Sequence, residues 1–111
     1  MEDKDIGAKP LSDWQPTTNK TDLAILGKFI EELTECANIA ARCIIQGIGE
    51  AEPETGKANK EALEDEVADV MAMATHVMNR FLLDRPRIHE RTDKKFTWKG
   101  TWFAKLAEGN S

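Results

Sequence analysis

The sequence predicts an all-α protein, a helical bundle of two long antiparallel helices plus shorter helices. Apolar residues recur at helical spacing over two long stretches, and a loop containing proline and glycine separates them. The β-branched residues follow the same helical spacing, and no hairpin turn is flanked by alternating apolar and polar residues. A chain of 111 residues with 41% apolar content is expected to form one domain with a modest core.

The chain is expected to begin with an irregular segment that leads into a long helix. Residues 1–20 contain Pro10 and Pro16 and show no sustained period, which predicts an N-terminal arm. Helical periodicity starts after Thr21, the expected N-cap, and stops at Gly47. The first helix is therefore expected to span about 25 residues, which is long for a small domain.

A second long helix and a short third helix are expected after the loop. The second is expected over residues 59–83, before Pro86 interrupts the pattern, and the third over residues 87–95. Residues 21–99 would form the domain, and residues 100–111 a C-terminal tail. The aromatic residues close to this end of the chain predict that it packs against another surface.

The first helix carries more apolar surface than one neighbouring helix covers. One apolar row consists of Leu26, Ile30, Leu33, Ala37, Ala40 and Ile44. A second row consists of Ile25, Phe29, Glu32, Cys36, Ile39 and Cys43. A helix that is apolar around more than half its circumference needs partners on two sides. We therefore expect oligomerisation to complete the bundle, as a homodimer or a homotetramer.

Two acids lie on apolar rows of the predicted helices. Glu66 lies in line with Val70 and Met73, and no Lys or Arg stands three or four residues from it. A carboxylate in apolar surroundings costs several kcal/mol unless it is paired or bound to a metal. Glu32 has Lys28 four residues before it, in the weaker orientation for such a pair. Glu66 therefore needs a partner from elsewhere.

Antiparallel pairing of the two helices predicts a metal site. The acids that would converge are Glu32, Glu35, Glu66 and Asp69. A divalent cation would relieve their mutual repulsion, and ligation by oxygen alone suits Mg²⁺, or Mn²⁺ in its place. The alternative, that the acids are solvated charges on helix faces, stays open for Glu31 and, less so, for Glu35.

Two elements of the sequence resemble a known signature. Residues 31–35 (EELTE) and 66–69 (EVAD) resemble the EExxE…ExxD pattern of the MazG-like, all-α nucleoside triphosphate pyrophosphatase superfamily. That superfamily also includes dimeric dUTPases and phosphoribosyl-ATP pyrophosphohydrolases. The similarity spans about residues 20–99, and it includes residues 91–96, where Asp93 stands in place of the family's Asn.

The resemblance implies a Mg²⁺-dependent hydrolase that cleaves the α–β phosphoanhydride of a nucleoside triphosphate into the monophosphate and pyrophosphate. Glu31 and Glu35 are the expected catalytic residues, which would orient or deprotonate the attacking water. The expected substrate-binding residues are Lys95, Arg91, Asp93 and Lys99. The change from Asn to Asp93 is expected to weaken the phosphate contact at that position.

Charge and hydropathy argue against several other functions. The net charge of −5 argues against binding of a nucleic acid polymer or of an acidic membrane surface. No apolar run approaches the roughly 18 residues of a membrane span. Cys36 and Cys43, two helical turns apart, are expected to be free thiols in a reducing compartment, and a cytoplasmic location is expected.

Two other functional classes explain the sequence less completely than the hydrolase does. A non-catalytic helical module that binds a partner helix is the main alternative, but it leaves the acid at Glu66 unexplained. A di-metal redox bundle would need a Glu-x-x-His motif, and no acid in this chain has a His three residues further on.

Overall fold

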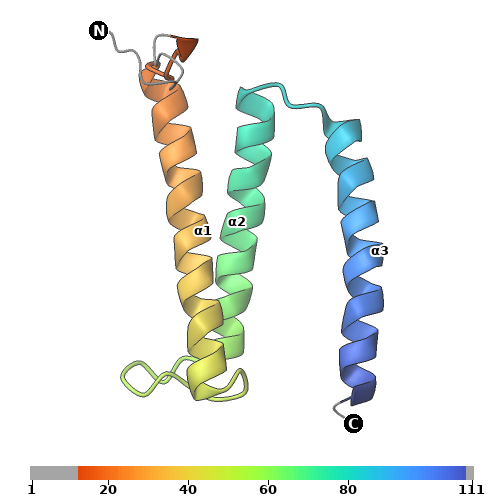
Figure 1. Ribbon diagram of the computed structural model, residues 1–111. Coiled ribbons are helices and arrows are strands. Elements are labelled where there is room, and N and C mark those ends of the chain that lie inside the picture. The colour runs from red at the N-terminus through yellow and green to blue at the C-terminus, as the bar shows by residue number, and fades with distance from the viewer. Residues whose placement is uncertain (1–12, 110–111) are drawn as a thin grey trace, which may run out of the picture. The chain divides into compact units, whose positions relative to one another are not determined.

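Three α-helices account for most of residues 13–109, the part of the chain that the computed structural model describes (Figure 1). The helices are α1 (Lys20–Gln46), α2 (Asn59–Arg80) and α3 (Arg85–Gly109). The all-α fold class is thus confirmed. The one β contact recorded within the described range is an isolated bridge between Ala51 and Ala58 in the α1–α2 loop. Most of the predicted N-terminal arm lies outside the described residues.

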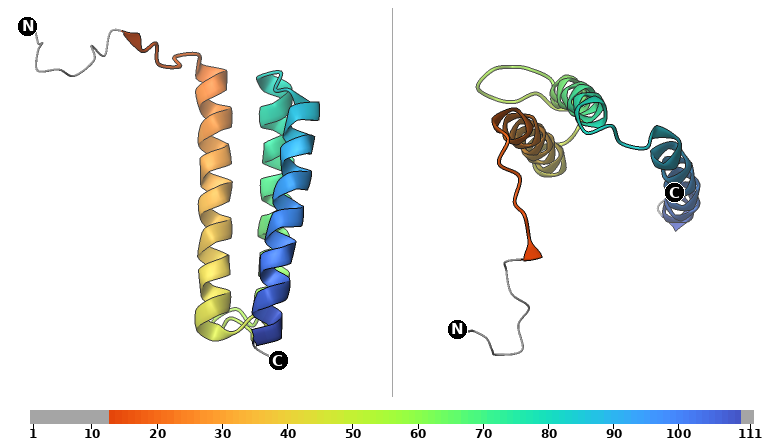
Figure 2. Two further views of the ribbon diagram at one scale, coloured as in Figure 1. Left: turned by 45° about the vertical axis from the view of Figure 1, so that its right-hand side comes forward. Right: turned by 90° about the horizontal axis from the view of Figure 1, so that it is seen from above.

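The chain divides into two compact units, Met1–Met73 and Ala74–Ser111. The first unit contains α1, the loop and most of α2, and the second contains the end of α2 and α3. Within the first unit, α1 and α2 lie side by side and antiparallel, as Figure 1 and Figure 2 both show. No described helix is sufficiently long and apolar to span a bilayer.

Helix α1 begins one residue before the predicted cap and ends at the predicted glycine. Its N-cap is Asn19, whose Oδ1 accepts a hydrogen bond from the N–H of Asp22 at 3.0 Å, so the prediction of Thr21 as the cap is wrong. At the other end Gly47 has a φ of 104°, and its N–H donates to the carbonyl of Cys43 at 2.9 Å. Glycine adopts this left-handed conformation without steric cost.

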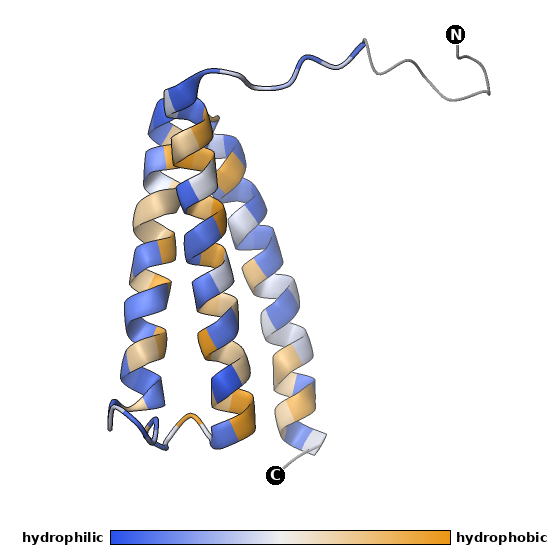
Figure 3. Cartoon of the chain, turned by 90° about the vertical axis from the view of Figure 1, so that its left-hand side faces the viewer, coloured by the Kyte–Doolittle hydropathy of each residue, from blue (hydrophilic) through white to orange (hydrophobic). Residues whose placement is uncertain are grey.

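The row of α1 that contains Glu32 packs against α2. Glu32 is buried, and the apolar members of this row are half-buried. The Sγ of Cys43, in the same row, lies 3.9 Å from the backbone oxygen of Asn59 on α2. The other apolar row of α1 is mostly exposed, with Ile30 at 63% and Ile44 at 86%. Figure 3 shows apolar segments alternating with polar ones along each helix.

Helix α3 is much longer than the predicted helix over residues 87–95. Asp84 is its N-cap, because Oδ1 of Asp84 accepts a hydrogen bond from the N–H of Arg87 at 3.0 Å. Pro86 lies in the first turn, where its missing N–H leaves no helical bond unmade. The expected tail, residues 100–111, is helical as far as Gly109.

Candidate metal centre

Three carboxylates from two helices meet at the α1–α2 interface. Glu32 and Glu35 lie one turn apart on α1, and Glu66 lies on α2. One carboxylate oxygen from each residue lies within 4.8 Å of the other two. Glu32 is 6% exposed, Glu66 is half-buried, and Glu35 is exposed. The antiparallel pairing therefore brings together three of the four predicted metal ligands.

Glu66 contributes a carboxylate oxygen whose hydrogen-bonding capacity is unused among the described residues. Its Oε1 is buried and has no hydrogen-bond partner within residues 13–109. An unpaired buried acceptor costs about 1–3 kcal/mol, and more if it is charged, so native proteins rarely leave one unmatched. An oxygen of this kind, beside two further carboxylates, is well suited to ligate a cation.

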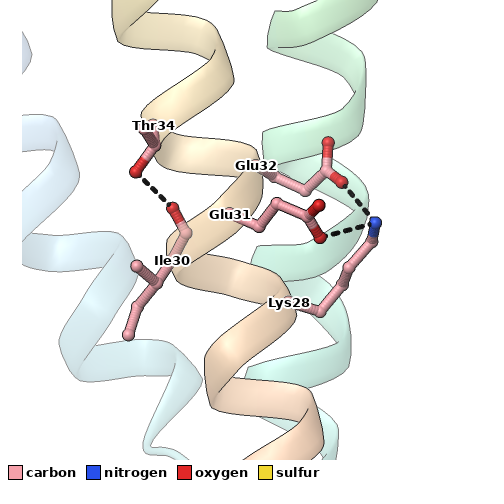
Figure 4. A network of polar contacts seen from close by, with 5 residues as sticks. All are labelled: Lys28, Ile30, Glu31, Glu32 and Thr34. Atoms are coloured by element: carbon pink, nitrogen blue, oxygen red, sulfur yellow. Dashed lines mark hydrogen bonds and ion pairs between the residues drawn. The ribbon is translucent and has the colours of Figure 1, made fainter.

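Lys28 compensates only part of the negative charge (Figure 4). Its Nζ lies 2.9 Å from Oε1 of Glu31 and 3.1 Å from Oε2 of Glu32, and these hydrogen bonds raise the pKa of the lysine, with Glu31 contributing most. Neither Glu35 nor Glu66 has an ion pair among the described residues. The ion pairs of Lys28 therefore involve Glu31 and Glu32, and the carboxylates of Glu35 and Glu66 are outside them.

The electrostatics of Glu35 reflect this imbalance. Although the side chain is exposed, partial desolvation beside its neighbours raises the pKa of the Glu35 carboxyl, and the negative charges of Glu32 and Glu66 raise the pKa further. A raised carboxyl pKa means that the ionised form is disfavoured in the folded protein. A bound divalent cation would reverse this effect, because it favours ionised carboxylates.

Two of the predicted site residues lie beside the cluster rather than in it. Asp69 is exposed on α2, one turn beyond Glu66, and it is not part of the group of three oxygens. Glu31 is 53% exposed at its side chain and points to Lys28, as Figure 4 shows. In the same view the hydroxyl of Thr34 donates to the carbonyl of Ile30 at 2.9 Å, which is a bond within the helix.

The predicted substrate-binding residues lie on α3, in the second unit. Arg91, Lys95 and Lys99 are spaced by four residues, so they form one row along the helix. Asp93 lies away from this row and faces His89, with 3.4 Å between Oδ2 and Nε2. The row lines a shallow groove together with Ile88, Thr92, Phe96, Gly100 and Phe103.

One buried polar residue close to the site, Asn59, has no signal in the sequence pattern. Asn59 begins α2 and is fully buried, although a loop-to-helix asparagine is ordinarily an exposed capping residue.

Comparisons of this chain with protein-family models, with curated proteins and with solved structures found no match. The chemistry of the cluster therefore carries the functional argument.

Proposed function

We propose that this protein is a Mg²⁺-dependent nucleoside triphosphate pyrophosphohydrolase whose metal ligands are Glu32, Glu35 and Glu66. The observation that carries the proposal is the buried, unpaired Oε1 of Glu66 beside two other carboxylates. Mn²⁺ would serve in place of Mg²⁺, because both cations take oxygen ligands.

The donor set fits a hard divalent cation. The cluster consists of carboxylates, with no thiol or imidazole in the group, which favours Mg²⁺ over Zn²⁺. When bound, the cation would polarise phosphate oxygens and offset the charge that develops during phosphoanhydride cleavage. Asp69 would be the fourth protein ligand, since its exposed side chain lies one turn from Glu66 and is free to change rotamer.

Glu31 and Glu35 are the proposed residues for orienting or deprotonating the attacking water. Glu35 lies within the cluster, beside the position proposed for the cation, where a carboxylate can orient a water molecule. Glu31 lies at the rim, and its ion pair with Lys28 holds its carboxylate on the solvent side of α1. Glu35 is therefore the better supported of the two.

The row of Arg91, Lys95 and Lys99 on α3 is proposed to bind the phosphates. An acidic protein needs a local concentration of positive charge to hold a triphosphate, and these three residues supply one along a single helix face. Asp93 would repel phosphate, and its place opposite His89 leaves it no evident substrate contact. It is the weakest of the four substrate-binding candidates.

A non-catalytic interaction module remains the alternative function. The exposed apolar residues of α1, such as Ile30 and Ile44, are the observation that favours it. In the hydrolase these residues would form contacts between subunits of a homodimer or homotetramer. Both functions use the same apolar row, and they differ in whether the acids bind a cation.

The test is pyrophosphate release from a panel of canonical and modified nucleoside triphosphates, with Mg²⁺ and with EDTA. We expect metal-dependent release from at least one substrate. Glu66→Gln should abolish it and leave the helical circular dichroism signal intact, because the amide keeps the shape and loses the charge. The matched control is Glu64→Gln, which changes an exposed acid on the same helix outside the cluster.

Either of two results would contradict the proposal. Full activity in Glu66→Gln would remove this residue from the metal site. Absence of release from every substrate, with the wild-type protein folded, would favour the interaction module.

A further inference from the structure

Asn59, the first residue of α2, connects α2 to the end of α1 by several hydrogen bonds. Its exposed fraction is 0%. Its Nδ2 donates to the carbonyl of Gly47 at 3.0 Å and to Oε1 of Gln46 at 3.1 Å. Its Oδ1 accepts from Nε of Arg42 at 3.2 Å, and its backbone N–H donates to the carbonyl of Glu50 at 2.9 Å. Every polar group of this side chain is thus bonded to α1 or to its C-cap.

These bonds oppose sliding of one helix along the other. Apolar contacts between helices are non-directional and tolerate small shifts, whereas a buried amide with directed bonds tolerates few positions. A shift of α2 along α1 would break the bonds from Asn59 to Arg42 and Gly47 together and leave their polar groups buried without partners. The burial of Asn59 therefore favours a single register of this helix pair.

The same register places the acids opposite one another. Arg42 follows Glu35 by seven residues on α1, and Asn59 precedes Glu66 by seven residues on α2. Seven residues are close to two helical turns, about 10.5 Å along the axis, and return to nearly the same face. In an antiparallel pair, the bond between Arg42 and Asn59 therefore implies that Glu35 and Glu66 are level. Their carboxylate oxygens do lie within 4.8 Å of each other.

We infer that Asn59 is a positioning residue of the carboxylate cluster, which sets the helix register that holds Glu66 level with Glu35. The inference rests on the proposed function, since it concerns the proposed cation site. A slip of one helical turn would move Glu66 by about 5.4 Å along the axis. Cation–oxygen distances of about 2.0–2.6 Å leave no room for such a slip.

The first measurement is Mn²⁺ affinity of the full chain, from the loss of the free Mn²⁺ signal in electron paramagnetic resonance. Asn59→Leu removes the bonds and keeps a side chain of similar size. We expect its affinity for Mn²⁺ to fall about tenfold or more at temperatures where it remains helical, as supporting residues of metal sites commonly show. Arg42→Met removes only the bond to Oδ1 and should have a smaller effect in the same direction.

The matched control is Thr55→Ala. The hydroxyl of Thr55 accepts a hydrogen bond from the N–H of Lys57 at 3.2 Å, which lies within the loop between α1 and α2. This variant should keep the wild-type Mn²⁺ affinity. A purely structural role for Asn59 would lower the midpoint of thermal unfolding and leave the affinity of the folded variant unchanged.

A second measurement reports the register without any metal. In a chain with Cys36→Ala and Cys43→Ala, the pair Glu35→Cys and Glu66→Cys should be bridged within one chain by dibromobimane, which fluoresces on linking two thiols. The off-level pair Glu35→Cys and Met73→Cys should be bridged poorly, because Met73 lies about 10.5 Å further along α2. Adding Asn59→Leu should remove the preference for the level pair.

The outcomes separate this inference from the proposed function. Wild-type Mn²⁺ binding with unchanged affinity in helical Asn59→Leu would overturn the inference and leave the proposed function standing. Absence of Mn²⁺ binding by the wild type would count against the proposed function. The bridging measurement would then test the helix register by itself. An unchanged preference for the level pair after Asn59→Leu would overturn the inference that Asn59 sets the register.

Discussion

Glu32 and Glu66 are both acids in the interface between α1 and α2, but their charges are compensated differently. Glu32 has Nζ of Lys28 at 3.1 Å, so its burial is partly offset within α1. Glu66 has a buried oxygen that finds no hydrogen-bond partner in the described part of the chain. Glu66→Gln is therefore the sharper test of the metal site, because no ion pair among the described residues compensates the charge of Glu66.

The raised pKa of Glu35 predicts how stability depends on pH when no metal is bound. A carboxyl whose pKa is higher in the folded state contributes stability that is present below its unfolded pKa and is lost as the pH rises through the folded value. Glu35→Gln should therefore raise the unfolding midpoint in EDTA at pH 7, and this gain should shrink as the pH falls toward 4. Thermal melts of both proteins across this range measure it.

Mg²⁺ provides the complementary control for this prediction. Ligands that bind the folded state stabilise it, so Mg²⁺ should raise the unfolding midpoint of the wild type more than that of Glu35→Gln. An equal response of both proteins to Mg²⁺ would show that Glu35 is not a ligand. If the increase in unfolding midpoint caused by Glu35→Gln grew as the pH fell, the pKa of Glu35 would not be raised.

Lys95→Ala tests the proposed phosphate-binding row on α3. The change should raise KM for the triphosphate several-fold with a smaller effect on kcat, because a contact to an outer phosphate is largely formed already in the bound substrate. Lys95 also lies over the ring of Trp98, with Nζ 5.7 Å from the ring centroid. Lys105→Ala, outside the row, is the control in steady-state kinetics, and equal KM values in both variants would exclude Lys95 from the site.

The end of α2 contains a backbone conformation that glycine would adopt more easily. Leu82 has a φ of 50°, and the N–H of Leu83 donates to the carbonyl of Met78 at 3.1 Å, which is a glycine-type helix ending. Leu82 is also 88% exposed, so its side chain contributes little burial. Leu82→Gly should stabilise the protein by about 0.5–1 kcal/mol, as the relief of backbone strain exceeds the entropic cost of glycine.

Chemical denaturation of Leu82→Gly and Leu83→Gly measures this effect. Leu83 does not have a positive φ and is less exposed, so its replacement should destabilise the protein. Destabilisation by Leu82→Gly of the same size as by Leu83→Gly would indicate that Leu82 forms contacts that outweigh its backbone strain.

Helix boundaries were predictable where one residue dominates the local chemistry. Gly47 ended α1 as expected, because it takes up a left-handed conformation there. The start of α3 differs from the prediction, because Pro86 lies within the first turn of the helix and does not interrupt it. Asp84 two residues earlier supplies the cap that makes a proline in the first turn compatible with a helix. The helical state of the segment after Lys95 also differs from the prediction, because its threonine, aromatic and glycine residues have a low intrinsic helix propensity.

The two apolar rows of α1 bear on how copies of the chain assemble. One row packs on α2, and the other leaves Ile30, Leu33 and Ile44 exposed. Among the described residues only Ala62 and Val77 are buried apolar residues, which is a small core for a stable fold. Contacts with further copies of the chain would supply the missing burial.

Ile44→Glu tests this assembly. Burial of a charge at a subunit contact costs several kcal/mol, so the variant should sediment as a monomer where the wild type sediments as a dimer or tetramer. Asn38→Glu changes an exposed polar residue of the same helix that belongs to neither apolar row, and it should keep the wild-type assembly. A monomeric wild type at micromolar concentration in analytical ultracentrifugation would contradict the prediction.

Periodicity and turn residues were sufficient to predict the all-α class, the two long helices and the presence of acids on their apolar rows. These features depend on local backbone preference and on which face each residue occupies. The convergence of Glu32, Glu35 and Glu66, the exposed position of Asp69 and the burial of Asn59 came only from the folded chain. A helical period states which residues share a face, but the partner of that face and the register of the pair depend on contacts between residues distant in sequence.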